Sequence, residues 1–343
     1  MSNSMDASRS RSRSRSWARG IGVCPSLAVL LALLAAVAVP VLKQPEAPRS
    51  QITLPEDGLV SSVLFDSSGD RIYSDHKALG PTVLQLDQEG ELYQGPSVGL
   101  GRCATMALDP GGRSLIIARE SGAIEVRDQE TLDLRQTLPG TDRSLSLAVS
   151  ADGQRLISVD QHDVCRCWSL AEGQVEWEYA EQAGITRCTL SPDGSRVVLG
   201  FRHGEIAVLD ASTGAELARW NGHGYGSILL ALAFTPDGGT LVSVGLEGRL
   251  RTWDALANWA SKLDITMPGG TSRSLAIAPD GRTLATGHND GQVRVWDLAT
   301  GSLLGEAAMA NVQLSSVCFE PRGQRLAVSF GSTVALIPTP GSV

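Results

Sequence analysis

A short turn ending in glycine recurs seven times in this 343-residue chain, and this recurrence constrains the fold more than any other feature. Each copy runs from an apolar residue through a small or acidic residue and a turn glycine into another apolar strand. The copies are FDSSGDRI from Phe65, LDPGGRSL from Leu108, VSADGQRL from Val149, LSPDGSRV from Leu190, FTPDGGTL from Phe234, IAPDGRTL from Ile277 and FEPRGQRL from Phe319. Their glycines are spaced by 43, 41, 41, 44, 43 and 42 residues, a period typical of four-stranded propeller blades.

The turn residues of each copy suit a hairpin between two strands, a and b. Proline presets φ at the first corner, Asp or Ser bonds to the local backbone, and glycine accepts a positive φ. A third strand, c, with two-residue periodicity follows in most copies. These strands are AIEVRD from Ala123, VCRCWS from Val164, EIAVLD from Glu205, RLRTWD from Arg249 and QVRVWD from Gln292. With a weaker strand d, the pattern predicts an all-β, seven-bladed propeller over residues 51–343.

Two of the c strands end in a Trp-Asp dipeptide, at Trp253-Asp254 and Trp296-Asp297, and the variants Trp168-Ser169 and Leu209-Asp210 occupy the same place. With these dipeptides, residues 51–343 resemble the WD-repeat propeller family. The resemblance implies a structural hydrogen-bonded set of histidine, Ser or Thr, an acid and tryptophan in a blade. The matching residues are His223, Ser243, Trp253 and Glu247 in blade five, and Thr286, Asp290 and Trp296 in blade six, which lacks the histidine. The family implies a framework role for this set, not an active site.

The last blade has sequence for only three strands, from about Leu314 to Ile337, so its fourth strand must come from elsewhere. SQITLPEDG at residues 50–58 matches KLDITMPGG at residues 262–270, the end of blade five. We therefore expect an N-terminal strand to complete blade seven, which closes the ring and pairs an otherwise open edge.

The first fifty residues indicate a membrane segment before the propeller. Residues 1–20 form an Arg/Ser-rich tail with five arginines and one acid, residues 21–42 carry no charge, and residues 43–50 form a linker. A stretch of 22 residues is long enough to cross a bilayer as a single hydrophobic helix. The arginine bias predicts a single-pass protein with a cytoplasmic N-terminus and an extracytoplasmic propeller.

A cleaved signal peptide is the alternative for the same segment. The densest apolar part, residues 27–36, is short, and Ala36-Val37-Ala38 resembles a signal-peptidase site. Cleavage there would give a secreted propeller. Both interpretations place the propeller outside the cytoplasm.

The net charge of the chain narrows the class of its partner. The formal charge of the chain is -8; residues 1–20 contribute +4, so the remainder carries -12. This acidity argues against nucleic acid as a partner.

The cysteines of the propeller sequence contain no C-x-x-C pair, and we expect them to be small buried hydrophobes. They are Cys103, Cys165, Cys167, Cys188 and Cys318.

The sequence offers little support for catalysis, a cofactor or a metal. It has no G-x-S-x-G, no H-E-x-x-H and no Gly-rich phosphate loop followed by a helix. His76, His162, His203 and His288 fall seven to nine residues after their turn glycines, which predicts polar positions in the b–c turns. If a metal were bound, His162 and His203 with Asp160 or Asp163 would be the candidate ligands.

The loops before strand a and between strands b and c emerge on one face of a propeller, called the loop face below. We expect a protein or peptide partner on this face, at residues near the starts of the a strands: Arg102, Arg143, Arg187, Tyr225 and Arg273. The sequence thus favours a non-catalytic, extracytoplasmic interaction scaffold anchored by its N-terminal segment. An exported propeller hydrolase or metal-dependent enzyme is the alternative.

Overall fold

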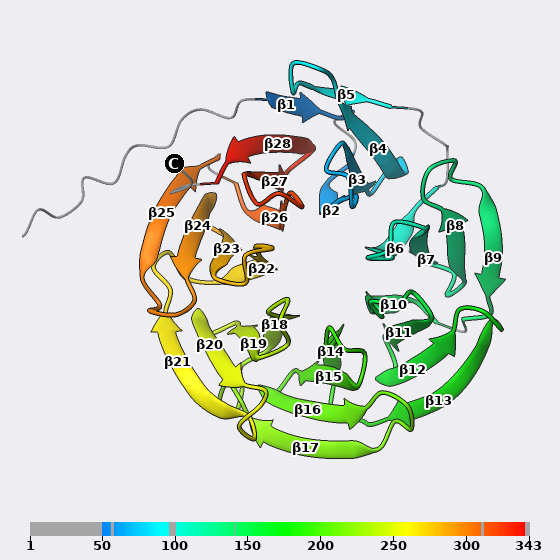
Figure 1. The fold of residues 1–343 in the computed structure, drawn as a ribbon, viewed down its shortest axis with the longest axis vertical. Coiled ribbons are helices and arrows are strands. Elements are labelled where there is room, and N and C mark those ends of the chain that lie inside the picture. Colours follow the sequence, from blue (N-terminus) through cyan, green and yellow to red (C-terminus); the bar gives the residue numbers. More distant parts are fainter. Residues whose placement is uncertain (1–49, 56–57, 96–100, 141, 310–311, 340–343) are drawn as a thin grey trace, which may run out of the picture. The chain divides into compact units, whose positions relative to one another are not determined.

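The computed structural model describes residues 50–55, 58–95, 101–140, 142–309 and 312–339. The chain divides into two units after Lys43, and all described residues belong to the second unit. There, strands β1 to β28 form seven four-stranded sheets around a common axis (Figure 1). The predicted all-β, seven-bladed propeller is therefore confirmed.

The expected hydrophobic helix at residues 21–42 lies outside the described residues, as do the tail and residues 43–49 of the linker. Within the described part of the chain, no helix is long and apolar enough to cross a membrane.

The first three blades follow one another along the chain, each as an antiparallel meander from the axis outward. Blade one contains β2 (Val60–Phe65), β3 (Arg71–His76), β4 (Gly80–Leu86) and β5 (Leu92–Gln94). Blade two contains β6 (Cys103–Leu108), β7 (Ser114–Arg119), β8 (Ile124–Asp128) and β9 (Leu134–Leu138). Blade three contains β10 (Ser144–Val149), β11 (Arg155–Asp160), β12 (Val164–Ser169) and β13 (Gln174–Ala180).

The next three blades repeat this order. Blade four contains β14 (Ile185–Leu190), β15 (Arg196–Phe201), β16 (Glu205–Asp210) and β17 (Glu216–Asn221). Blade five contains β18 (Leu229–Phe234), β19 (Thr240–Gly245), β20 (Arg249–Asp254) and β21 (Ala260–Thr266). Blade six contains β22 (Ser272–Ile277), β23 (Thr283–His288), β24 (Gln292–Asp297) and β25 (Leu303–Ala308).

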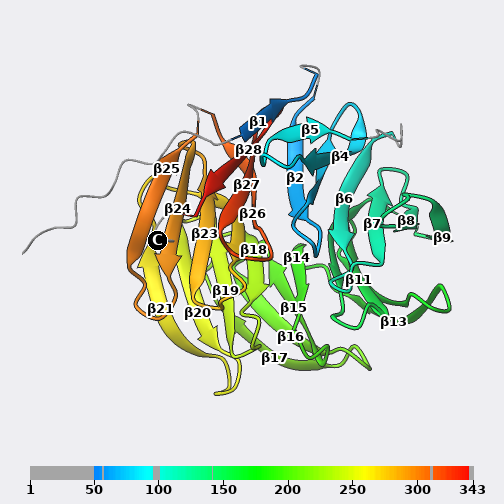
Figure 2. The ribbon, with the colours of Figure 1, turned by 45° about the horizontal axis from the view of Figure 1, so that its top comes forward.

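Blade seven is built from both ends of the propeller sequence. It contains β26 (Leu314–Phe319), β27 (Arg325–Phe330), β28 (Thr333–Pro338) and, as its outer strand, β1 (Ser50–Thr53). The register pairs Ser50 with Leu336 and Ile52 with Val334, and β1 lies beside β28 in both views (Figures 1 and 2). The predicted closing strand is therefore present.

The seven turn glycines have φ values between +66° and +82°, the left-handed region that glycine adopts without a Cβ clash. Each donates its backbone N–H to the carbonyl three residues earlier, as Gly153 does to Ser150 at 2.8 Å. The repeated sequence motif is thus the a–b turn of every blade.

The hydrophobic core lies in layers between neighbouring sheets. In one layer, Ile157 and Cys167 of blade three pack with Leu199 and Phe201 of blade four, all four fully buried. The inner strands nearest the axis differ from the b strands, because each carries a β-bulge near its start. Bulges change the direction of the local side chains, so these positions decide what the propeller presents near its axis.

Candidate functional site

Blade five contains a buried hydrogen-bonded chain that joins its strands. Trp253 Nε1 donates to Ser243 Oγ at 2.8 Å, and the two ring nitrogens of His223 lie 2.7 Å from Ser243 Oγ and 2.6 Å from Glu247 Oε1. Burial alone raises the pKa of Glu247, but hydrogen bonds from His223 and Ser227 outweigh it, so that this pKa is lowered. Ser243, Trp253 and His223 are buried, so the set ties β19 and β20 to the loop before β18 and leaves only Glu247 within reach of a ligand.

Blade six builds a related chain from different residues. Trp296 Nε1 donates to Thr286 Oγ1 at 2.8 Å, and Thr286 Oγ1 lies 2.8 Å from His288 Nε2. Blade six has no histidine before its strand a, but the last residue of β23 supplies a histidine from a different position. Asp290 bonds to Arg294 at 2.7 Å instead of to a histidine.

The four histidines expected in b–c turns fall into two groups. His162 and His203 are exposed in turns, and His162 Nδ1 lies 3.2 Å from Asp142 Oδ1. His76 and His288 end strands β3 and β23 and are fully buried, so their assignment as polar loop residues is wrong. No group of three or more His, Cys, Asp or Glu residues in the described part of the chain is arranged to hold a metal ion.

The five predicted partner-binding residues all lie at the loop face. Arg102, Arg143 and Tyr225 are exposed in loops before strand a, and the side chain of Tyr225 is 88% exposed. Arg187 and Arg273 differ from the expectation of loop positions. They lie within the inner strands β14 and β22, where Arg187 is half-buried and Arg273 exposed.

Ion pairing with carboxylates distinguishes a set of loop-face arginines from most other arginines of the described residues. Many arginines elsewhere form close ion pairs, as Arg166 does with Asp160 at 2.5 Å. Among the described residues, a set on the loop face forms no ion pair with a carboxylate. Its members are Arg102, Arg143, Arg187, Arg202 and Arg273. Arg202, in the b–c turn of blade four, was not among the predicted residues.

Several acids of the loop face are already bonded within the protein. Asp163 accepts the backbone N–H groups of Gly184 and Ile185, and Glu181 pairs with Arg219. Glu247 and Asp290 are held as described above. The unpaired groups on this face are therefore mainly cationic, although residues 21–343 as a whole are acidic.

Exposed apolar side chains gather on the same loops. Leu59, Tyr225 and Val312 precede inner strands, and Leu246 lies in the b–c turn of blade five. Most other large exposed apolar residues lie on the outer d strands. Leu59, Leu246 and Val312 were not among the predicted residues, although each lies within two residues of a strand end.

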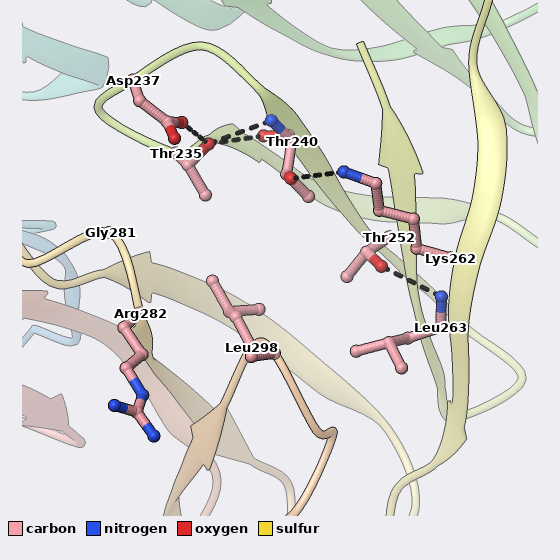
Figure 3. Close-up of a pocket in the computed structure, with 10 residues that line it drawn as sticks. Thr235, Asp237, Thr240, Thr252, Lys262, Leu263, Gly281, Arg282 and Leu298 are labelled. Atoms are coloured by element: carbon pink, nitrogen blue, oxygen red, sulfur yellow. Dashed lines mark hydrogen bonds between the residues drawn. The ribbon is translucent and has the colours of Figure 1, made fainter. Parts of the chain in front are cut away.

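A pocket of about 350 Å³ opens between blades five and six on the opposite face, where the a–b turns lie (Figure 3). Its charged residues already have partners: Lys262 Nζ lies 2.9 Å from Asp254, and Arg282 Nε 2.8 Å from Asp297. Thr235 and Asp237 bond to each other within their turn. The lysine and the arginine of this pocket are therefore already paired with carboxylates.

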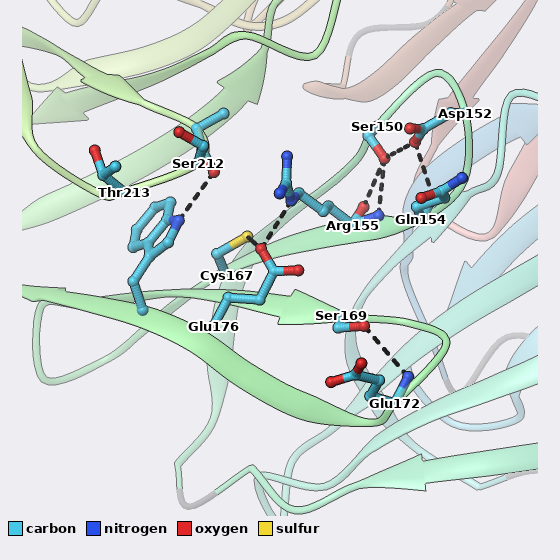
Figure 4. A network of polar contacts seen from close by, with 12 residues as sticks. Ser150, Asp152, Gln154, Arg155, Cys167, Ser169, Glu172, Glu176, Ser212 and Thr213 are labelled. Atoms are coloured by element: carbon cyan, nitrogen blue, oxygen red, sulfur yellow. Dashed lines mark hydrogen bonds and ion pairs between the residues drawn. The ribbon is translucent and has the colours of Figure 1, made fainter.

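The polar groups near the a–b turn of blade three also bond to one another (Figure 4). Arg155 Nε donates to Glu176 at 2.8 Å, and its backbone N–H donates to Ser150 Oγ at 2.9 Å. Trp177 Nε1 reaches across to the carbonyl of Ala211 in blade four at 2.9 Å. The contacts of Arg155 therefore hold blade three together, and the bond of Trp177 joins blades three and four.

The five cysteines of the described residues are all free thiols. Cys103, Cys165, Cys167 and Cys188 are buried, as predicted, whereas Cys318 is partly exposed. Cys103 Sγ donates to the buried Asp75 at 2.8 Å, and burial, followed by the charge of Asp75, raises the pKa of this thiol far above its usual range. A thiol held in the protonated form is a poor nucleophile.

The fold and its buried Trp–Ser and Trp–Thr pairs define a seven-bladed β-propeller in which buried polar networks join the strands of a blade. A family description, "WD domain, G-beta repeat" (WD40), matches residues 214–254 and 265–297, which contain both Trp-Asp dipeptides. The chain therefore carries WD40 repeats within a seven-bladed propeller.

Three curated relatives share part of this sequence. The chain is 29% identical over 154 residues to transcription factor unc-37 of Caenorhabditis elegans, covering 44% of this chain and 24% of the relative. It is 26% identical over 152 residues to protein groucho of Drosophila melanogaster, covering 44% and 20%. It is 26% identical over 167 residues to autophagy-related protein 16 of Arabidopsis thaliana, covering 48% and 32%. The matches thus span between about a fifth and a third of the relatives' lengths.

Proposed function

We propose that the chain is a non-catalytic protein-interaction scaffold, presented outside the cytoplasm, that binds a protein or peptide through its loop face. One observation carries the proposal: arginines without a carboxylate partner and exposed apolar side chains share this face. Unpaired guanidinium groups and exposed aromatic residues are enriched where proteins bind one another. The relatives named as a transcription factor and an autophagy-related protein are not named for a catalytic activity.

Site-specific photocrosslinking tests the loop face as the binding surface. A photoreactive amino acid replaces Tyr225 in one variant and Arg322, exposed in an a–b turn of the opposite face, in a matched control. Illumination of intact native cells should give a discrete crosslinked protein band at position 225 and none at 322. A band at position 322 alone would place the partner on the opposite face.

The extracytoplasmic location rests on the sequence of residues 1–42, with five arginines before an uncharged stretch. Protease added outside the membrane of intact cells should digest or shed the propeller and leave the N-terminal tail protected. A protected propeller would contradict the export of this domain. A mature protein starting at Val39 would show that the segment is a cleaved signal peptide.

A further inference from the structure

The seven inner strands, β2, β6, β10, β14, β18, β22 and β26, contain only two charged residues, Arg187 and Arg273. Every other residue on these strands is apolar, small or a neutral hydroxyl or thiol. Both arginines lie beside the β-bulges near the loop face, at the register shifts after Ile185 and Ser272. They belong to blades four and six, which flank blade five.

The backbone around both arginines is held in place. Thr186 Oγ1 donates to the Leu229 carbonyl of blade five at 2.7 Å, and Arg187 Nη1 donates to the Thr186 carbonyl at 2.7 Å. Ser272 Oγ lies 2.9 Å from the carbonyls of Ser274 and Gly287, which brackets Arg273. A site whose groups are fixed before binding loses less entropy on binding.

Arg187 and Arg273 both lie near the loop face on inner strands around the axis, and neither forms an ion pair with a carboxylate among the described residues. Burial, and then the positive charge of Arg273, lower the pKa of Arg187. A lowered pKa means that the guanidinium cation is disfavoured where it lies. A bound anion offsets the effect of both causes, because its counter-charge stabilises the guanidinium cation in a partly desolvated place.

An apolar surface lies next to this pair. Tyr225 and Leu246 are exposed in the two loop-face loops of blade five. Leu246 N donates to the Ile228 carbonyl at 2.8 Å, and Thr271 Oγ1, two residues before Arg273, bonds to the Leu246 carbonyl at 3.0 Å. The apolar surface and the cation pair therefore meet at blades five and six.

We infer that Arg187 and Arg273 form the specificity site for an acidic segment of a partner protein, whose Asp or Glu carboxylate sits between the two guanidinium groups. A neighbouring apolar side chain of the segment covers Tyr225 and Leu246. A carboxylate suits the pair because it carries one charge and two acceptor oxygens, which two guanidinium groups can bond together. This inference rests on the proposed function and names the chemistry that its loop face recognises.

The test uses full-length chain in detergent and three immobilised pools of nine-residue peptides. Each pool has random flanks and a fixed central residue, which is Glu, Gln or phosphoserine. The chain should be retained on the Glu pool at least about tenfold more tightly than on the Gln pool, as expected for a charge-assisted contact. Equal retention on the Glu and Gln pools would overturn the inference. Tighter retention on the phosphoserine pool would overturn the choice of a carboxylate.

Two variants locate the site. R187Q/R273Q should abolish the preference for Glu, whereas R102Q/R143Q, which removes two loop-face cations away from the inner strands, should keep it. R273Q alone should weaken the preference, and because Arg273 is exposed this variant controls for misfolding of the double variant. A preference that survives R273Q and R187Q/R273Q would place the anion elsewhere. If Tyr225 crosslinks a partner but the pools show no preference for Glu, this inference fails while the proposed function stands.

Discussion

His288 Nε2 lies 2.8 Å from Thr286 Oγ1, so the last residue of strand β23 completes a buried network that a loop histidine completes in blade five. The imidazole of His288 is fully buried, and its Nδ1 has no hydrogen-bond partner among the described residues. The charged groups nearby are Arg294 and Asp290, which pair with each other. A protonated His288 would therefore be an additional, unpaired charge in the interior.

This environment makes the stability of the propeller sensitive to mild acid. Burial first, and then the charge of Arg294, lower the pKa of His288 from 6.5 to about 4. The unfolded chain binds this proton more readily, so the contribution is fully present above about pH 6.5 and is lost as the pH falls toward 4. The loss is on the order of 3 kcal/mol. Urea denaturation at a series of pH values measures it.

The variant H288Q should flatten this pH dependence, because glutamine does not titrate. H203Q, at an exposed turn histidine, is the matched control and should keep the dependence of the wild-type chain. Identical pH profiles for H288Q and the wild-type chain would show that other groups cause the acid sensitivity.

Ser243 is the centre of the blade-five network, and its removal should cost more than the removal of its counterpart in blade three. Ser243 bonds to both His223 and Trp253, whereas Ser158 bonds to Trp168 alone at 2.8 Å. S243A leaves two buried polar groups unsatisfied and should lower the free energy of unfolding by about 2–4 kcal/mol. S158A should cost about 1–2 kcal/mol. Equal losses in chemical denaturation would mean that the His223 contact contributes nothing.

The repeat period predicted the seven blades because a positive φ restricts a turn position to few residues, and glycine therefore marks every a–b turn. The histidines were harder to place. His76 and His288 come seven residues after their turn glycines, and His162 and His203 come nine. That difference of two residues separates the buried end of strand b from the exposed tip of the b–c turn, and the pattern does not fix the strand end to within two residues.

The candidate site was predicted only in outline. The sequence placed five residues near the starts of the a strands, but it did not distinguish Arg187 and Arg273 from Arg102 and Arg143. What sets these two pairs of arginines apart is the β-bulge of each inner strand, which lies seven to nine residues before the turn glycine. Arg187 and Arg273 fall within this interval, whereas Arg102 and Arg143 lie ten residues before their glycines, and the sequence pattern does not show where pairing with strand b begins. Some ion pairs of the other arginines are local, as that of Arg113 with Asp109 is. Others join different strands, as that of Arg155 with Glu176 does, and spacing along the chain did not reveal those.

Closure of the ring by β1 makes the N-terminal strand essential to stability. Leu54 is buried beside it, and its N–H donates to the Ser332 carbonyl at 2.9 Å. Deletion of residues 1–54 exposes the edge of β28, including the fully buried Val334. It should therefore lower the melting temperature far more than deletion of residues 1–45, which leaves β1 intact.

The lost backbone bonds, at about 1 kcal/mol each, together with the uncovered apolar surface amount to several kcal/mol. The shorter truncation is the control, since both variants lack residues 21–42. Similar melting temperatures for the two truncations would show that β1 adds little to the closed ring.

A pair of glycines in blade four separates the cost of backbone conformation from the cost of packing. Gly214 and Gly194 have φ values of +72° and +69°, so alanine at either position adopts a conformation that costs about 1–2 kcal/mol. A Cβ at Gly194 meets nothing within 4 Å, whereas a Cβ at Gly214 lies 2.7 Å from the ring of Trp177. That ring cannot move away without breaking its bond to the Ala211 carbonyl.

G214A should therefore lose about 1–3 kcal/mol more than G194A in the free energy of unfolding, through displacement of Trp177 from the contact between blades three and four. Urea denaturation measures both losses, and the intrinsic tryptophan fluorescence of the folded state should change for G214A only. The double variant G214A/W177L tests the cause, since removal of the indole relieves the clash. G214A should then cost about the same as G194A when each is compared with its own parent, W177L and wild type. An undiminished extra cost of G214A in the W177L background would mean that the loss arises from the backbone of the c–d turn and not from the contact between the blades.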